Sequence, residues 1–134
     1  MRILTILALT VAFVQDPSSE ISRLRTSWSR QDAAGVVTSS TRVVIQLPGE
    51  AATAPLSSDQ AARALARLFV DATEIGLDVD TVRTLGHEAV YAEMRRRFRV
   101  RGSEGTMEQR VFAAFRLDGD RWRLQELRVG TAGQ

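Results

Sequence analysis

Cysteine is absent from the 134-residue chain, and so is lysine. Without cysteine the chain cannot form disulfides, bind a metal through thiolates or carry a lipid on an N-terminal cysteine. All 18 basic residues are arginine, which we read as a bias of codon usage. Packing alone must therefore stabilise the fold, and an apolar fraction of 44% is enough for one core in a chain of this length.

Histidine and tyrosine occur once each, as His87 and Tyr91. A zinc site or a Ser-His-Asp triad would have to be built around His87, which lies beside a glycine in an expected hairpin turn. Asp78 and Asp80 alternate along an expected strand, and that segment lacks the further oxygen ligands that calcium requires. The sequence therefore predicts no metal and no cofactor.

The N-terminal 15 residues have the pattern of a signal peptide. Arg2 is followed by the almost wholly apolar segment 3–14. As a helix this segment would span about 18 Å, less than the hydrocarbon core of about 30 Å. We expect residues 1–15 to be a signal peptide, so that the chain is exported to the periplasm or secreted, with no stable membrane span after cleavage. An interfacial anchor or a buried N-terminal segment is the alternative.

Residues 16–130 are expected to form one domain, followed by a flexible tail over 131–134. Asp16 can cap a first helix and Asp32 a second, short one, while Ser57 with Gln60 fits the capping box of a third. After the third helix the spacing of apolar residues changes from the helical to the strand period. The expected elements are helices over 17–31, 33–38 and 57–72, and strands over 42–47, 75–85, 90–101, 107–117 and 122–129.

The last four strands read as an antiparallel meander. In its final strand, Trp122 and Leu124 are at even positions, whereas Leu127 and Val129 are at odd positions. Residues of the same parity point to the same face of a regular strand. Strict alternation cannot bury all four side chains, so we predict a β-bulge or bend near residues 125–126.

The order of these elements resembles that of the nuclear transport factor 2-like (cystatin-like) cone fold. Its landmarks here are Trp28, the segments 32–34 and 47–49, and the ending WRLQELRV over 122–129. The segment 47–49 and the ending over 122–129 are most similar to those of small exported bacterial domains of unknown function. The resemblance covers 17–130 and implies an α+β fold in which a curved antiparallel sheet wraps around a long helix, in the order α-α-β-α-β-β-β-β. The fold hosts isomerases, dehydratases, cyclases, transport factors and domains without known activity, so it implies shape and not function.

In that fold the concave side of the sheet lines a pocket, and two polar residues should point into it. Arg96 and Gln109 share parity with the apolar side chains of their strands, and Trp122 and Glu126 share parity in the last strand. A buried charge is costly unless it is paired, so Arg96 needs an acidic partner, for which Glu126 is the candidate. Either these polar side chains satisfy one another, or Arg96 binds an anionic ligand. A register that leaves Arg96 exposed is the third alternative.

Catalysis of the ketosteroid isomerase type needs a carboxylate base that faces a pair of hydrogen-bond donors. Tyr91 has outward parity, so no donor pair is evident, and scytalone dehydratase-like chemistry needs a histidine that His87 is misplaced to supply. We therefore expect a non-catalytic domain that binds a small or peptide-like ligand in its concave pocket, or a protein partner, including a second copy, through its sheet. The alternative is a small isomerase, dehydratase or cyclase with Glu126 as general base.

Arginines on the outward face of the meander form the expected partner surface: Arg95, Arg97, Arg99 and Arg101. Residues 83–128 carry eleven arginines against seven acids, and such a patch suggests polyanion binding as a further alternative. The alternation spreads these arginines along one strand face, where Glu108 of the next strand can interleave with them. Export argues against nucleic acid as the partner.

Overall fold

The computed structural model describes residues 16–131. The predicted signal peptide and the last three residues of the predicted tail lie outside this range. The elements follow the expected order: α1 (Pro17–Ser29), α2 (Ala33–Val36), β1 (Val44–Gln46), α3 (Ser58–Phe69), β2 (Ala72–Leu85), β3 (Ala89–Val100), β4 (Thr106–Asp118) and β5 (Arg121–Thr131). Within the described range, no helix is long and apolar enough to cross a membrane.

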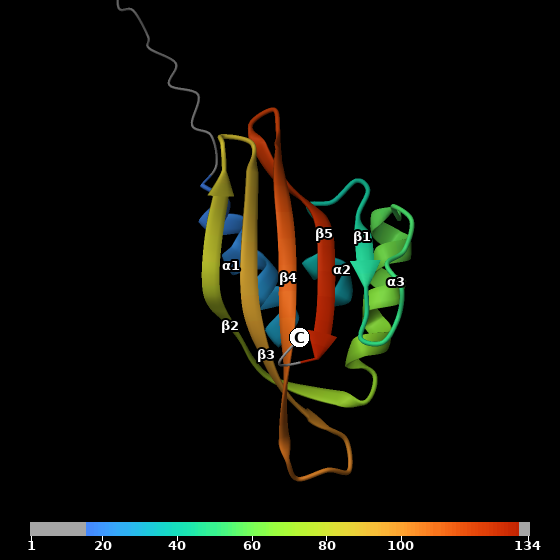
Figure 1. Cartoon of the computed structure of the whole chain (residues 1–134). Helices are drawn as coiled ribbons and strands as arrows, with labels where there is room; N and C mark the ends of the chain where they lie inside the picture. Colours follow the sequence, from blue (N-terminus) through green and yellow to red (C-terminus); the bar gives the residue numbers. More distant parts are fainter. Residues whose placement is uncertain (1–15, 132–134) are drawn as a thin grey trace, which may run out of the picture.

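The strands form one curved five-stranded sheet in the order β1-β5-β4-β3-β2. The predicted antiparallel meander of β2 to β5 is confirmed. Strand β1 joins it by pairing in parallel with β5, with Val44 opposite Glu126. All three helices lie on one side of the sheet, and no helix of residues 16–131 covers the opposite, outer face (Figure 1). The fold is thus α+β, with two distinct sheet faces.

The predicted caps are present. Asp16 accepts a hydrogen bond from the backbone N–H of Ser18, and Asp32 accepts one from Gly35, each at 3.0 Å. Ser57 and Gln60 form the complete capping box of α3. These side chains satisfy N–H groups that have no partner within a helix, which explains why the helices start where the sequence predicts.

Helix α3 ends earlier than predicted, and β2 begins earlier. The side-chain amide of Gln31, which follows α1, donates to the carbonyl oxygens of Phe69 and Ala72 at 3.3 and 3.0 Å. Residue 31 has a positive φ of 55°. This long-range contact holds the chain where it leaves α3, and Ala72 therefore belongs to the strand instead of the helix.

The core lies between the helices and the inner face of the sheet. Trp28 of α1 is fully buried and meets Phe69 of α3 edge to face, with ring centroids 5.1 Å apart. Met94, Leu127 and Leu65 are likewise buried between the layers. The burial of each such side chain stabilises the folded state by about 1.5–3 kcal/mol.

A bulge at Gln125 of β5 confirms the one predicted there. Ala114 of β4 is opposite Glu126, but the next residue, Phe115, is opposite Leu124. Gln125 is the extra residue, and the parity of β5 changes across it. Trp122, Leu124, Leu127 and Val129 are consequently all buried.

Strand β2 has two further bulges that the sequence analysis did not predict. Glu74 and Gly76 are opposite consecutive residues of β3, which leaves Ile75 as the extra residue, and Asp80 is bulged in the same way. By simple alternation Ile75 would share the apolar face of Leu77, but it is 43% exposed. The first of these bulges determines the geometry of the candidate site.

Candidate functional site

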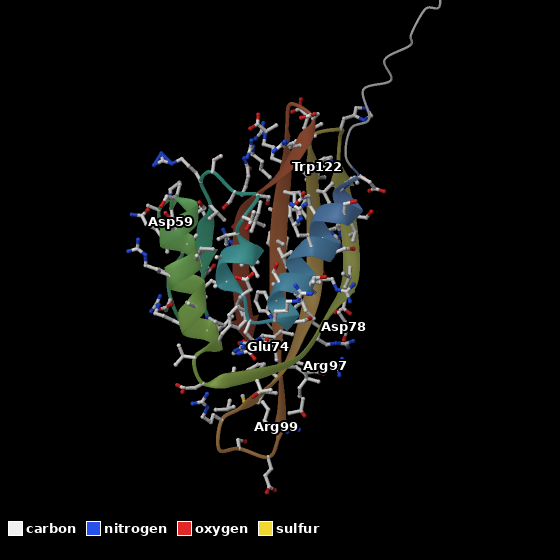
Figure 2. All side chains as sticks on the ribbon, turned by 180° about the vertical axis from the view of Figure 1, so that it is seen from behind. Asp59, Glu74, Asp78, Arg97, Arg99 and Trp122 are labelled. Carbon is white, nitrogen blue, oxygen red and sulfur yellow. The ribbon has the colours of Figure 1, made fainter. Side chains whose placement is uncertain are left out.

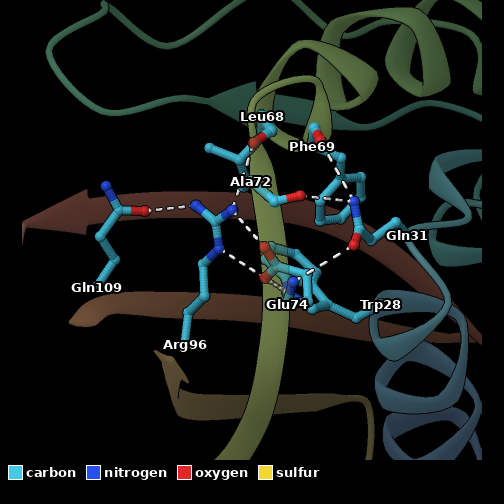
Figure 3. Close-up of polar contacts among 8 residues, drawn as sticks. All are labelled: Trp28, Gln31, Leu68, Phe69, Ala72, Glu74, Arg96 and Gln109. Atoms are coloured by element: carbon cyan, nitrogen blue, oxygen red, sulfur yellow. Dashed lines mark hydrogen bonds and ion pairs between the residues drawn. The ribbon is translucent and has the colours of Figure 1, made fainter. Parts of the chain in front are cut away.

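Arg96 lies on the inner face of β3 and is almost completely buried, with 1% of its side chain exposed. Its Nε and Nη2 atoms donate to the two carboxylate oxygens of Glu74 on β2, at 2.7 and 2.6 Å (Figure 3). Such a two-point contact between guanidinium and carboxylate is the strongest ion-pair geometry that side chains form. The predicted partner, Glu126, is therefore wrong, and the acid that neutralises Arg96 is Glu74.

The ion pair is the centre of a wider network (Figure 3). The indole N–H of Trp28 donates to Glu74 Oε1 at 2.6 Å, and Gln31 Oε1 accepts from the backbone N–H of Glu74 at 3.3 Å. On its other side, Arg96 donates to Gln109 Oε1 at 2.8 Å and to the carbonyl oxygen of Leu68 at 3.3 Å. The network thus joins α1, α3 and three strands.

Arg96 has little bonding capacity left. Its hydrogen bonds use four of the five N–H groups of the guanidinium. The guanidinium carbon also lies 3.8 Å from the ring centroid of Phe98, a cation–π contact. Among the described residues, every buried side-chain nitrogen or oxygen has a hydrogen-bond partner. Arg96, Gln109 and an acid therefore satisfy one another, as one of the sequence-based alternatives required.

Strand alternation alone does not predict that Glu74 points inward, because Ile75 is bulged. By simple alternation Glu74 would point away from Leu77, towards the outer face. The extra residue reverses the parity, so that Glu74 and Leu77 both face inward, opposite Phe98 and Arg96 of β3. One signal was present, because Gly76 is an isolated glycine within a strand and such glycines often mark bulges.

A groove of about 320 Å³ lies where the cone opens beside this network. Its walls are mainly apolar and include Leu47, Leu68 and Phe98, and parts of Arg96 and Gln109 contribute to the lining. Arg67 and Glu50 form an ion pair at 3.1 Å among the lining residues. The buried network closes the cone beneath the groove, since its side chains occupy the space between α1, α3 and the sheet.

The other two predicted ligand-binding residues lie elsewhere. Glu126 follows the bulge at Gln125, points to the outer face and accepts a hydrogen bond from Arg128. Trp122 is buried on the inner face, at the end of the sheet opposite to Glu74 (Figure 2). The structure therefore brings Arg96 and Gln109 together and separates both from Trp122 and Glu126. A general base at Glu126 would face away from the interior of the cone.

The outward arginines are partly neutralised by acids of β2. Arg97 donates to Asp78 at 3.1 Å, and Arg95 lies 3.8 Å from Asp80. Arg99 lies further along the outer face of β3, whereas Arg101 lies in the turn after the strand and was wrongly placed within it. This surface therefore mixes both signs of charge.

The outer face also holds an apolar centre, which we call the outer patch: Tyr91, Phe112 and Ala114. The two rings are stacked with centroids 5.5 Å apart, and Ala114 is only 7% exposed. A groove of about 430 Å³ adjoins Phe112, with Glu93, Arg110 and Arg128 among its lining residues. The outer patch therefore places apolar surface at the centre of a charged sheet face.

Between residues 16 and 131, no group of three or more histidine and acidic side chains is placed to hold a metal ion. His87 is exposed in the turn between β2 and β3.

No family model matches the chain, and no curated protein matches it. Several solved structures match it, however. A DUF4783 family protein from Bacteroides uniformis has 10% identity and a TM-score of 0.70, with 84% of this chain and 97% of that one covered. A domain of unknown function with a cystatin-like fold from Nostoc punctiforme has 13% identity and a TM-score of 0.72, with 93% and 80% covered.

A third similar structure is a ketosteroid isomerase-like protein from Erwinia carotovora, with 12% identity, a TM-score of 0.68, and 95% of this chain and 99% of that one covered. At such identities the similarity shows the fold alone. The chain therefore has the nuclear transport factor 2-like, cystatin-like cone fold.

Proposed function

We propose that the chain is a non-catalytic, exported binding domain whose partner is a second copy of itself, held through the outer face of the sheet. The outer patch supports this proposal most directly. It presents stacked aromatic rings on a face that no described helix covers. Aromatic residues at the centre of a patch with a polar rim are typical of protein–protein interfaces.

The charges around the outer patch favour a second copy over an unrelated polyanion. A two-fold interface sets the same surface against itself, so each charge needs a partner of opposite sign on the same face. Here Asp78 and Asp80 of β2 lie beside Arg95 and Arg97 of β3. A surface with both signs can pair with itself, whereas a uniformly basic surface would repel its copy.

The buried network favours a structural role for the interior over catalysis. Glu74 accepts three hydrogen bonds through its carboxylate and is 1% exposed. A general base must reach the proton that it removes, and Glu74 is occupied by Arg96 and Trp28. Glu126, the base proposed from the sequence, lies on the outer face.

The test is the molar mass of the protein in solution, measured by sedimentation velocity over a range of concentrations. We expect a dimer for the unchanged protein and a monomer for Phe112→Glu, which sets a charge into the outer patch. Met107→Glu is the matched control, because Met107 is on the same strand and already 49% exposed. A monomeric unchanged protein at micromolar concentrations, or a dimeric Phe112→Glu, would refute the proposal.

A second candidate is a ligand in the groove at the opening of the cone. The groove of about 320 Å³ is at the lower end of the range of about 300–1,000 Å³ for small-molecule sites. Its apolar walls and the one remaining N–H of Arg96 would suit a small apolar molecule with a single acceptor group. Val100→Glu, in the wall of the groove, should abolish retention of such molecules in a mass-spectrometric screen, whereas Val82→Glu, on an exposed part of β2, should not.

A further inference from the structure

Glu20, in the first turn of α1, is a buried acid with few partners. It is 7% exposed, and its carboxylate accepts no hydrogen bond from another described side chain or backbone group. Its one ion pair is with Arg23 at 3.8 Å, and the Arg23 side chain is 58% exposed. No fully buried side-chain oxygen of the described residues lacks a partner, so the Glu20 carboxylate oxygens keep contact with solvent in the pocket that Glu20 lines. The Glu74 side chain is more deeply buried, at 1% exposed against 8% for Glu20, and its carboxylate accepts three hydrogen bonds from the protein.

Glu20 lines a pocket of about 260 Å³. The other walls come from Arg23 of α1, from Thr38 and Ser39, which follow α2, and from residues 121–123 at the start of β5. The pocket lies at the end of the sheet that holds Trp122, away from Glu74 and the opening of the cone (Figure 2). It is therefore separate from both surfaces of the proposed function.

Hydrogen-bond donors line this pocket together with Glu20. Arg123 is held in place, because it donates to Asp118 at 2.7 Å and to the carbonyl oxygen of Ser39 at 3.3 Å, and it keeps further N–H groups. The hydroxyl oxygen of Ser39 accepts from the backbone N–H of Leu124 at 3.2 Å, which leaves its own O–H free to donate. Arg121 makes no ion pair with a described acid and also lines the pocket.

This combination of charges restricts the class of ligand. A simple anion would bind the arginines but would be repelled by Glu20, and a simple cation would meet three arginines. A small molecule with an ammonium group and a carboxylate can satisfy both sides at once. The volume of about 260 Å³ is below the usual range for drug-sized ligands, about 300–1,000 Å³, so the molecule must be small.

We propose that this pocket is a binding site for a small zwitterion of the α-amino acid type. The ammonium group donates to the Glu20 carboxylate, and the ligand carboxylate accepts from Arg121 and Arg123. Charge-assisted hydrogen bonds of this kind are short and strong, and they would supply the partners that Glu20 lacks within the protein. The Glu20 carboxylate, which has one long ion pair and no hydrogen bond among the described residues, is then the preorganised, ligand-free form of the site.

Calorimetric titration with L-alanine, L-serine, L-glutamate and L-lysine tests the proposal. We expect at least one to bind at millimolar concentrations or below. Its N-acetyl derivative lacks the ammonium and its amide lacks the carboxylate, so each should bind at least tenfold more weakly. Equal binding of the N-acetyl derivative would reveal a plain anion site and overturn the proposal. The absence of binding by all four amino acids would overturn it as well.

Two substitutions separate binding from structure. Glu20→Gln and Arg121→Gln should each weaken the amino acid at least tenfold, whereas Glu104→Gln and Arg83→Gln, which alter exposed residues elsewhere, should not. In the absence of ligand, Glu20→Gln should melt at the same temperature as the unchanged protein or higher, because it removes a poorly paired buried charge. A clearly lower melting temperature would make Glu20 a structural residue and contradict the proposal.

Discussion

Glu74 and Arg96 form the most buried ion pair of the described chain, although the two residues are not directly opposite each other. Glu74 is opposite Phe98 in the register of β2 and β3, and Arg96 is opposite Leu77. The guanidinium therefore reaches diagonally past the ring of Phe98, its centre 3.8 Å from the ring centroid, to the carboxylate. Only the extra residue at Ile75 allows Glu74 to share the inner face with Leu77.

Removal of Glu74 should strongly destabilise the fold. Glu74→Gln leaves the Arg96 charge buried without its counter-charge, and the free energy of unfolding should fall by about 3–5 kcal/mol. Chemical denaturation followed by circular dichroism measures this change. The exposed pair of Arg97 and Asp78 is the control, since Asp78→Asn should cost only about 0–1 kcal/mol. Equal losses for the two variants would contradict the assignment.

Replacing both members of the buried pair should restore much of the stability. The double variant Glu74→Leu with Arg96→Met has no buried charge and a similar side-chain volume. Buried ion pairs can often be replaced by apolar residues without loss, so the double variant should be more stable than Glu74→Gln. The same denaturation curves test this. If the double variant were less stable than Glu74→Leu alone or Arg96→Met alone, the ion pair itself would be strongly stabilising.

Trp28 should contribute through its indole N–H as well as through its ring. Trp28→Phe keeps an aromatic ring beside Phe69 but removes the donor to Glu74 Oε1. Hydrogen bonds to charged groups contribute about 1.5–3 kcal/mol to stability. We expect the free energy of unfolding to fall by that amount, and by a smaller further amount because phenylalanine fills less of the core than tryptophan. The measurement is the midpoint of urea unfolding with an unchanged slope.

The bulge at Ile75 can be tested with two residues of the same parity. Leu77→Ala should cost about 2–5 kcal/mol, because Leu77 is 3% exposed and its removal leaves a cavity. Ile75→Ala should cost no more than about 1 kcal/mol, because Ile75 is 43% exposed at the bulge. An unbulged strand would bury both residues and give similar losses, so the ratio of the two values distinguishes the two registers.

Binding of polyanions through the arginines of β3 should be weak. Arg95 and Arg97 already lie beside acids, so few positive charges are available for phosphates or sulfates. We expect elution from a heparin column at low salt, and Arg99→Gln should change the elution little. Tight retention that decreases steeply with salt would instead support the polyanion interpretation.

The sequence alone was sufficient for every feature with a local cause. Helix starts follow from caps at Asp16, Asp32 and Ser57, and strands follow from alternation. Even the bulge at Gln125 could be predicted, because four apolar residues of two parities had to be buried in one strand. The inward positions of Arg96 and Gln109 follow from the same alternation.

The partner of Arg96 was decided only by the tertiary structure. A charged residue must find a counter-charge in the core, but which acid it meets depends on register between strands that are distant in sequence. The bulge at Ile75 turns Glu74 inward, and the bulge at Gln125 turns Glu126 outward. Each single-residue shift exchanges the two faces of a strand, so alternation predicts the faces only between bulges. The sequence thus determined the elements and the polar positions of the core, and the packing of the layers determined which of them meet.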